Sequence, residues 1–202
     1  MFENKKGLRL LFFDTETTGL PKDWNAPVSD VNNWPRLVQI AWLVYFDGTL
    51  ILKNEYIIKP DGFTIPKQAS DVHKITTERA KKEGLILNSI LQEFYNEVKK
   101  SDLLVAHNST FDRKWFGKGY LPETSKPWLC TMDDISWPSD KQLRCRPSVR
   151  DLALAYGIPV WNAHRALTDC IYVAEVLARC DDLEALLIQG LEPRRLMRAK
   201  VS

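Results

Sequence analysis

Apolar runs of the length expected for β-strands recur along the first two thirds of this 202-residue chain. They cover residues 8–13, 36–46, 50–59, 102–106 and 128–132. The first run is apolar from Leu10 to Phe13, which predicts a strand buried on both faces. The second and third flank Asp47-Gly48, a strong β-hairpin signal. A hairpin added to a sheet that is otherwise built with helical crossovers gives a mixed sheet, so the pattern predicts an α/β fold.

Apolar positions at helical spacing separate or follow these runs. They predict helices over residues 88–100, 148–156 and 181–191, one that carries Asp112 and Trp115, and one that begins after His164. We expect residues 1–180 to form one domain. Residues 181–202 are expected to form a C-terminal helix and a basic tail, from which the natural protein could continue into a further module.

The helix after His164 has two distinct stripes. Its apolar stripe consists of residues 166, 170, 173, 174 and 177, and its polar stripe of Arg165, Thr168, Tyr172, Glu175 and Arg179. Asp169 lies beside Ala166 and Val173, so its carboxylate should point toward the protein body, where a charged group needs a partner. Arg165 is on the polar stripe, and its replacement by alanine is expected to change the chemistry little.

Two acids directly follow the first strand. Because side chains alternate along a strand, Asp14 and Glu16 project to one side and Thr15 to the other. The two carboxylates repel each other unless a cation lies between them, and hard oxygen ligands suit Mg²⁺ or Mn²⁺. A solvated junction between strand and loop is the alternative interpretation.

Two later segments place further acids near histidines. In residues 101–112, a short apolar strand is followed by His107 and then by Asp112. Further along, His164 precedes Asp169 by five residues, so its side chain can lean over the same pocket. A lone histidine is more often structural than catalytic, but this spacing favours a functional interpretation of His164.

The three segments together resemble the motifs of a known family. DTETTG, HNSTFD and HRALTD occur in the order of the three motifs of the DEDDh-type 3′–5′ exonucleases. This DnaQ-like group includes the proofreading subunits of the polymerase III epsilon type. The resemblance runs from about Leu8 to Arg179. It implies a ribonuclease H-like fold, with a mixed central sheet flanked by α-helices, and hydrolysis of phosphodiester bonds from 3′ ends with release of nucleoside 5′-monophosphates.

The resemblance also implies a catalytic set of Asp14, Glu16, Asp112, His164 and Asp169. Its four carboxylates would hold two divalent ions, Mg²⁺ or Mn²⁺, which lie about 3.5–4 Å apart in such sites and clamp the attacking and departing oxygens. We expect Asp14 to bridge the ions, with Glu16 and Asp169 on the nucleophile side. Asp112 would support the leaving-group side. His164 would be the general base, because a histidine reference pKa of about 6.5 suits proton transfer from water.

Contacts with the terminal nucleotide follow from the same resemblance. The predicted contact residues are Thr15, Thr17, Leu20, His73, Asn108 and Phe111. Leu20 and Phe111 are expected to contact the last base. His73 belongs to DVHKIT, which is similar to the family's Val-His-Gly-Ile-Thr stretch, except that Lys74 stands where glycine is usual.

Structural interpretations compete with several of these contacts. Thr17 and Thr18 could hold the turn instead of presenting hydroxyls and amides to the nucleotide. Asn108 could cap the following helix, and His107 could bond only to the backbone.

The long loop over residues 20–35 contains Trp24 and Trp34. It could be a lid whose indoles stack on unpaired bases, because base–aromatic stacking contributes about 1–3 kcal/mol per base. Alternatively, both indoles could pack on the loop's own domain.

Composition is ordinary for a globular protein, with 45% hydrophobic and 27% charged residues. No stretch reaches the roughly 20 apolar residues of a membrane span, so no membrane partner is expected. The first ten residues lack the apolar core of a secretory signal. The four cysteines show no zinc-like spacing, which favours a reduced, cytoplasmic setting.

The net charge of +2 is too small to indicate nucleic-acid binding by itself. Basic residues do gather in three places: Lys5, Lys6 and Arg9; Arg144, Arg146 and Arg150; Arg194, Arg195, Arg198 and Lys200. These clusters could line a phosphate backbone or could simply be solvated.

Three functions are compatible with the sequence. Single-stranded DNA 3′ ends are the favoured substrate, because DTETTG is closer to the epsilon-type motif than to that of oligoribonuclease. Trimming of RNA 3′ ends is the alternative, and a polymerase or repair partner is suggested by the resemblance. A non-catalytic nucleic-acid-binding or scaffold module is a third hypothesis, disfavoured because all five catalytic-set residues are present.

Overall fold

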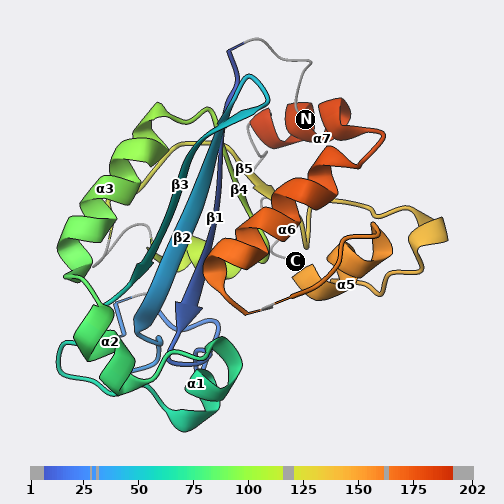
Figure 1. Ribbon diagram of the computed structural model, residues 1–202. Helices are drawn as coiled ribbons and strands as arrows, with labels where there is room; N and C mark the ends of the chain where they lie inside the picture. Colours follow the sequence, from blue (N-terminus) through green and yellow to red (C-terminus); the bar gives the residue numbers. More distant parts are fainter. Residues whose placement is uncertain (1–6, 28, 31, 116–120, 162–163, 193–202) are drawn as a thin grey trace, which may run out of the picture.

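The structure is a computed structural model that describes residues 7–27, 29–30, 32–115, 121–161 and 164–192. Within these residues, the strands of one sheet (Figure 1) are β1 Arg9–Thr17, β2 Leu37–Phe46, β3 Thr49–Ile57, β4 Leu103–Ala106 and β5 Trp128–Cys130. Their order across the sheet is β3-β2-β1-β4-β5. β1 is antiparallel to β2 and parallel to β4, and β4 is parallel to β5. The predicted α/β class with a mixed sheet is confirmed.

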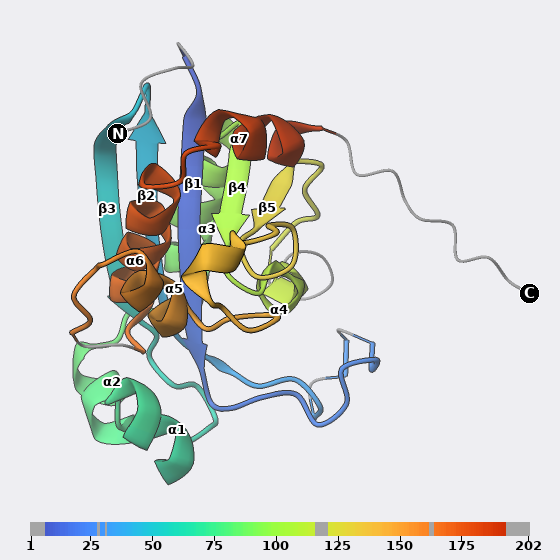
Figure 2. The same cartoon turned by 90° about the vertical axis from the view of Figure 1, so that its right-hand side faces the viewer.

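The α-helices of the described part are α1 Lys67–His73, α2 Thr77–Glu83, α3 Leu87–Lys100, α4 Ser109–Asp112, α5 Val149–Ala155, α6 Ala166–Ala178 and α7 Leu183–Leu191. Helix α3 covers one face of the sheet, and α6 and α7 cover the other (Figures 1 and 2). Helix α5 packs against α6. The short helices α1 and α2, which the sequence pattern did not predict, lie beyond the end of β1 that carries the two acids.

A hydrophobic core lies on each face of the sheet, and alternate side chains of β1 belong to the two cores in turn. Leu10 and Phe12 pack with α6 and α7, whereas Leu11 and Phe13 pack with α3. All four are at most 2% exposed, which confirms the strand buried on both faces. The same alternation carries the next even-numbered residues, which are the acids, toward the α6 side.

The predicted hairpin between β2 and β3 is also confirmed. Asp47 and Gly48 have φ angles of 51° and 78°, as both central residues of a type I′ turn require.

Two helix predictions need correction. Tyr172 was assigned to the polar stripe of its helix, but it is fully buried between α6 and α5. Its hydroxyl accepts from the backbone N–H of Trp161 at 2.6 Å and donates to the Trp161 carbonyl at 2.5 Å, which satisfies the only polar atom of the side chain. The helix expected to carry both Asp112 and Trp115 ends at Asp112, and a 3₁₀ turn covers Arg113–Trp115.

Helix α7 packs on the same core as α6, through Leu186 and Leu187. Gly190 lies so close to the sheet that an added Cβ would be 3.1 Å from side-chain atoms of Leu103 and Leu129. Among the described helices, none is long and apolar enough to cross a membrane.

Candidate active site

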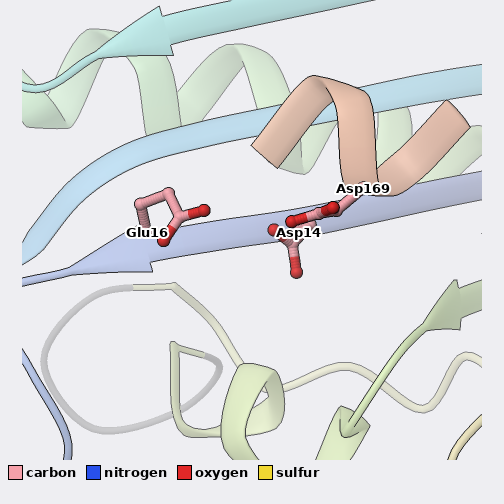
Figure 3. Close-up of side chains that lie close together, drawn as sticks. All are labelled: Asp14, Glu16 and Asp169. Atoms are coloured by element: carbon pink, nitrogen blue, oxygen red, sulfur yellow. The ribbon is translucent and has the colours of Figure 1, made fainter. Parts of the chain in front are cut away.

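Three carboxylates converge where β1 passes beneath the start of α6. Asp14 and Glu16 extend from β1, and Asp169 extends from the first turns of α6 (Figure 3). One carboxylate oxygen from each lies within 4.8 Å of the other two. The expectation that Asp169 points toward the protein body is therefore met, because its helix is pinned to the sheet by Ala166, Cys170 and Val173.

Asp112 does not belong to this group of three, although it lies near enough for its charge to raise the pKa values of Asp14 and Glu16. It is 2% exposed, and its Oδ1 accepts a 2.8 Å hydrogen bond from the Thr15 hydroxyl. Thr15 is itself buried. Its side chain is thus placed to orient Asp112, and the prediction that Thr15 contacts the substrate gains no support from this geometry.

The electrostatics of the four acids follow from their burial and mutual repulsion. Burial, followed by the charges of Asp169 and Asp112, raises the pKa of Glu16 to about 8. Burial raises the pKa values of Asp112 and Asp169 to about 7 each, against opposing hydrogen bonds. The pKa of Asp14 is raised well above its usual range by burial, and then by Asp169, Asp112 and Glu16. Without nearby positive charge, the four carboxylates cannot all be ionised at neutral pH. Their hard oxygen donors are the ligands that divalent cations such as Mg²⁺ prefer, so the cluster fits such cations.

His164 lies directly before α6 and is exposed. Its backbone is left-handed, with φ of 65°, and its backbone N–H donates to the Asp169 carboxylate. The predicted base is therefore tied to one of the clustered acids by its main chain, while its imidazole faces solvent.

The turn after β1 uses both threonine hydroxyls for its own structure. The Thr17 hydroxyl donates to the Gly19 carbonyl at 2.6 Å. The Thr18 hydroxyl accepts from the Arg36 N–H, and the Thr18 N–H donates to the Arg36 carbonyl, both at 2.9 Å. These contacts favour the structural interpretation of the two hydroxyls. Leu20, next along the chain, is 74% exposed and remains available to a base.

His73 is buried at the end of α1, and the backbone of Thr17 is near enough to influence its pKa, which burial lowers. Its Nδ1 accepts from the Ile75 N–H at 3.2 Å, and its Nε2 has no hydrogen-bond partner among the described residues. Lys74 caps α1 in the left-handed conformation, with φ of 62°. Lysine here adopts a left-handed conformation that glycine adopts more easily.

His107 and Asn108 lie at the end of β4. The Nε2 of His107 donates to the Pro147 carbonyl, so Nδ1 accepts from the Thr131 hydroxyl, each at 2.9 Å. Burial lowers the pKa of His107 to about 4, which keeps the ring neutral. The structural interpretation of His107 is favoured. Asn108 precedes α4, but its side chain makes no capping hydrogen bond, and its Oδ1 accepts from Arg146 at 3.4 Å.

The two tryptophans of the loop between β1 and β2 differ in exposure and contacts. Trp34 is 7% exposed and donates from Nε1 to the Pro27 carbonyl, so the indole packs on its own domain. Trp24 is 43% exposed, and its ring meets that of Phe111 edge-on with centroids 5.9 Å apart. Trp34 therefore follows the interpretation in which the indole packs on its own domain. Trp24 keeps an exposed ring that could stack on a base.

Sequence reasoning missed the interactions of Arg165. Arg165 lies on the predicted polar stripe, and its Nη2 pairs with Glu55 Oε2 of β3 at 3.3 Å. The first turn of α6 also bonds to Gln39 of β2, through Ala166. No local signal reveals these contacts, because the partners are more than 100 residues apart.

The basic clusters are largely paired where the structure describes them. Arg9 pairs with Glu97, Arg144 with Asp151 and Arg146 with Asp133. Lys5, Lys6 and residues 194–200 lie outside the described residues.

The fold and the acidic cluster place this chain in a known class, because the chain belongs to the exonuclease family: a family model described as Exonuclease matches residues 11–177. Exodeoxyribonuclease 10 of Escherichia coli K12 is 29% identical over 170 residues, which cover 83% of this chain and 66% of that protein. The PolC-type DNA polymerase III of Streptococcus pneumoniae D39 is 28% identical over 205 residues, or 94% of this chain and only 13% of the polymerase. The chain thus spans less than two thirds of each of these curated relatives.

Solved structures agree with this assignment. A structure of Exonuclease X in complex with 5′ overhanging duplex DNA is 26% identical, with a TM-score of 0.61 over 91% of this chain and 95% of that chain. E. coli Exonuclease I in complex with a dA16 oligonucleotide has a TM-score of 0.65 over 90% of this chain and 43% of that chain; at 19% identity it supports the fold alone. The predicted DnaQ-like family and ribonuclease H-like fold are confirmed.

Proposed function

We propose that this protein is a metal-dependent 3′–5′ exonuclease that removes nucleoside 5′-monophosphates from single-stranded DNA ends. The observation that carries the proposal is the convergence of Asp14, Glu16 and Asp169 within 4.8 Å, at the point where α6 begins. Asp112 and His164 flank this cluster.

The four acids would hold two divalent ions, Mg²⁺ or Mn²⁺, which would neutralise phosphate charge and acidify the attacking water. We assign the bridging role to Asp14, because the charges of Asp169, Asp112 and Glu16 all raise its pKa and it is therefore near each of the other acids. His164 would take the water proton as the water oxygen attacks phosphorus. The bond from phosphorus to the 3′ oxygen of the preceding nucleotide would break, and that oxygen would take a proton from solvent and stay on the shortened strand. Asp112, whose Oδ1 accepts from the Thr15 hydroxyl, would support the leaving-group side.

The half-exposed Trp24, against Phe111, would contribute an aromatic surface for the terminal base, together with Leu20. Such a surface suits unstacked bases of a single strand. DNA is preferred over RNA as the substrate because Exonuclease X and Exonuclease I were solved with DNA. The PolC-type relatives make association with a polymerase a second proposal.

The test uses 3′-labelled and 5′-labelled single strands, as DNA and RNA in parallel, with Mg²⁺, Mn²⁺ or EDTA. Stepwise release of mononucleotides from the DNA 3′ end, only with metal, is the expected result. Asp14→Ala should abolish it, whereas Glu184→Gln, which changes an exposed acid on α7, should not. Faster RNA degradation would favour the alternative of RNA trimming. Strand binding without cleavage under any condition would favour a scaffold and refute the enzyme.

A further inference from the structure

The N-terminal end of α6 is held by side chains from two strands. Gln39 Oε1 accepts from the Ala166 N–H at 3.1 Å, and Gln39 Nε2 donates to Glu55 Oε1 at 3.1 Å. Glu55 Oε2 accepts from Arg165 Nη2 at 3.3 Å. Because Arg165 and Ala166 are adjacent, these three hydrogen bonds close a ring between β2, β3 and the start of α6.

This ring replaces a cap that α6 lacks. The first N–H groups of a helix have no partner within it, and Arg165, at the N-cap, has no side-chain capping bond. Gln39 is 1% exposed and supplies the acceptor from another element. In the β1–β2 register, Gln39 is also the residue opposite Glu16. Gln39 therefore holds the start of α6 from the strand position that pairs with the clustered acid Glu16.

His164 depends on this anchor more than Asp169 does. Asp169 lies one turn inside a helix that is packed on the sheet by buried side chains. His164 lies outside the helix, exposed and left-handed, and its imidazole has no hydrogen-bond partner among the described residues. Its own N–H is bonded to the Asp169 carboxylate, and the residue that follows it, Arg165, is held by the Gln39–Glu55–Arg165 ring.

We propose that Gln39, Glu55 and Arg165 form a positioning network that orients His164 over the carboxylates. This inference rests on the proposed function, in which His164 is the base. The three side chains bond to one another and to the Ala166 N–H, so the network acts through the backbone of residues 164–166. A base displaced by about 1 Å costs up to about 100-fold in rate, so the network bears directly on turnover.

The experiment compares Glu55→Gln, which keeps the shape but removes the charge, with wild type. We expect kcat for release from a single-stranded DNA 3′ end to fall about 10- to 100-fold, with KM changed less than about 3-fold. The matched control is Glu175→Gln, which breaks an ion pair with Arg179 on the same helix, and should leave kcat unchanged. Arg165→Lys should retain more activity than Arg165→Met.

A double-mutant cycle separates positioning of His164 from a merely structural role. In a His164→Ala background, Glu55→Gln should lower kcat by no more than about 2-fold, because the residue through which it acts is gone. An equal loss in both backgrounds would overturn the proposal, as would an unchanged kcat in the single variant.

An activity-free measurement keeps this test independent of the proposed function. In EDTA, hydrogen exchange of the Ala166 amide should speed up at least about 10-fold in Gln39→Met, because its acceptor is removed. An unchanged exchange rate would show that Gln39 does not anchor the start of α6, and it would overturn the proposed network. A wild-type protein that cleaves nothing, yet shows the exchange effect, would refute the exonuclease proposal and the role of His164 as base, while leaving the anchor intact.

Discussion

The clustered acids should make the metal-free protein lose stability as the pH rises through neutrality. Burial and repulsion hold the pKa of Glu16 at about 8, and that of Asp14 well above its usual range. Unfolded carboxyls ionise near pH 4. Near pH 7 the folded state therefore binds more protons than the unfolded state, so the free energy of unfolding falls with pH.

The magnitude follows from the number of protons retained. Each one lowers the free energy of unfolding by about 1.4 kcal/mol per pH unit. For a domain of this size, 1 kcal/mol corresponds to about 2–4 °C in Tm, so each proton gives a fall of about 3–6 °C per pH unit. Burial lowers the pKa values of His73 and His107, which opposes this trend at lower pH, so the useful window is pH 7.0–8.0, where histidines are mostly neutral in both states.

The assay is thermal unfolding in EDTA at pH 7.0, 7.5 and 8.0, repeated with excess Mg²⁺. With metal, the charged carboxylates are paired, so Tm should rise and lose most of its pH dependence. Glu16→Gln should flatten the EDTA slope, and Glu184→Gln should not. A wild-type Tm in EDTA that is constant or rising across this window would refute the argument that the acids retain protons.

Three further predictions concern the catalytic step and the substrate. His164→Ala should leave Mg²⁺ affinity, measured by calorimetry, within about 2-fold of wild type and lower kcat by at least about 100-fold; lost metal binding would contradict its role as base. Thr15→Val removes the hydrogen bond to Asp112, so the acidic limb of the pH–rate profile should move up by about 1–2 pH units; an unmoved limb would show that Asp112 does not limit the rate. Trp24→Ala should raise the Kd for single-stranded DNA about 5- to 100-fold in fluorescence anisotropy, with Trp24→Phe close to wild type. Equal affinities of all three proteins would exclude stacking.

The parts of the fold that the sequence predicted are those with local causes. The apolar run before Asp14 and the Asp47-Gly48 turn each act within a few residues, so pattern and propensity suffice. The inward direction of Asp169 also followed from helical spacing. Tyr172 was misassigned because a helical wheel gives the direction of a side chain but not what covers it. The ring that holds Arg165 joins positions 110 residues apart, which spacing alone cannot reveal.

Left-handed backbone conformations occur at several junctions beside the candidate site residues. Lys74, Asn108 and His164 all have left-handed backbones without being glycine, with φ of 62–65°. Such a conformation costs roughly 1–3 kcal/mol unless the surroundings determine it. Each junction is held by a short-range hydrogen bond: the Lys74 N–H donates to the Ser70 carbonyl, the Asn108 carbonyl accepts from the Phe111 N–H, and the His164 N–H donates to the Asp169 carboxylate. Because the same bonds that stabilise the strained residues also aim the residues beside them, relaxing a junction would move a candidate site residue before it unfolded the domain.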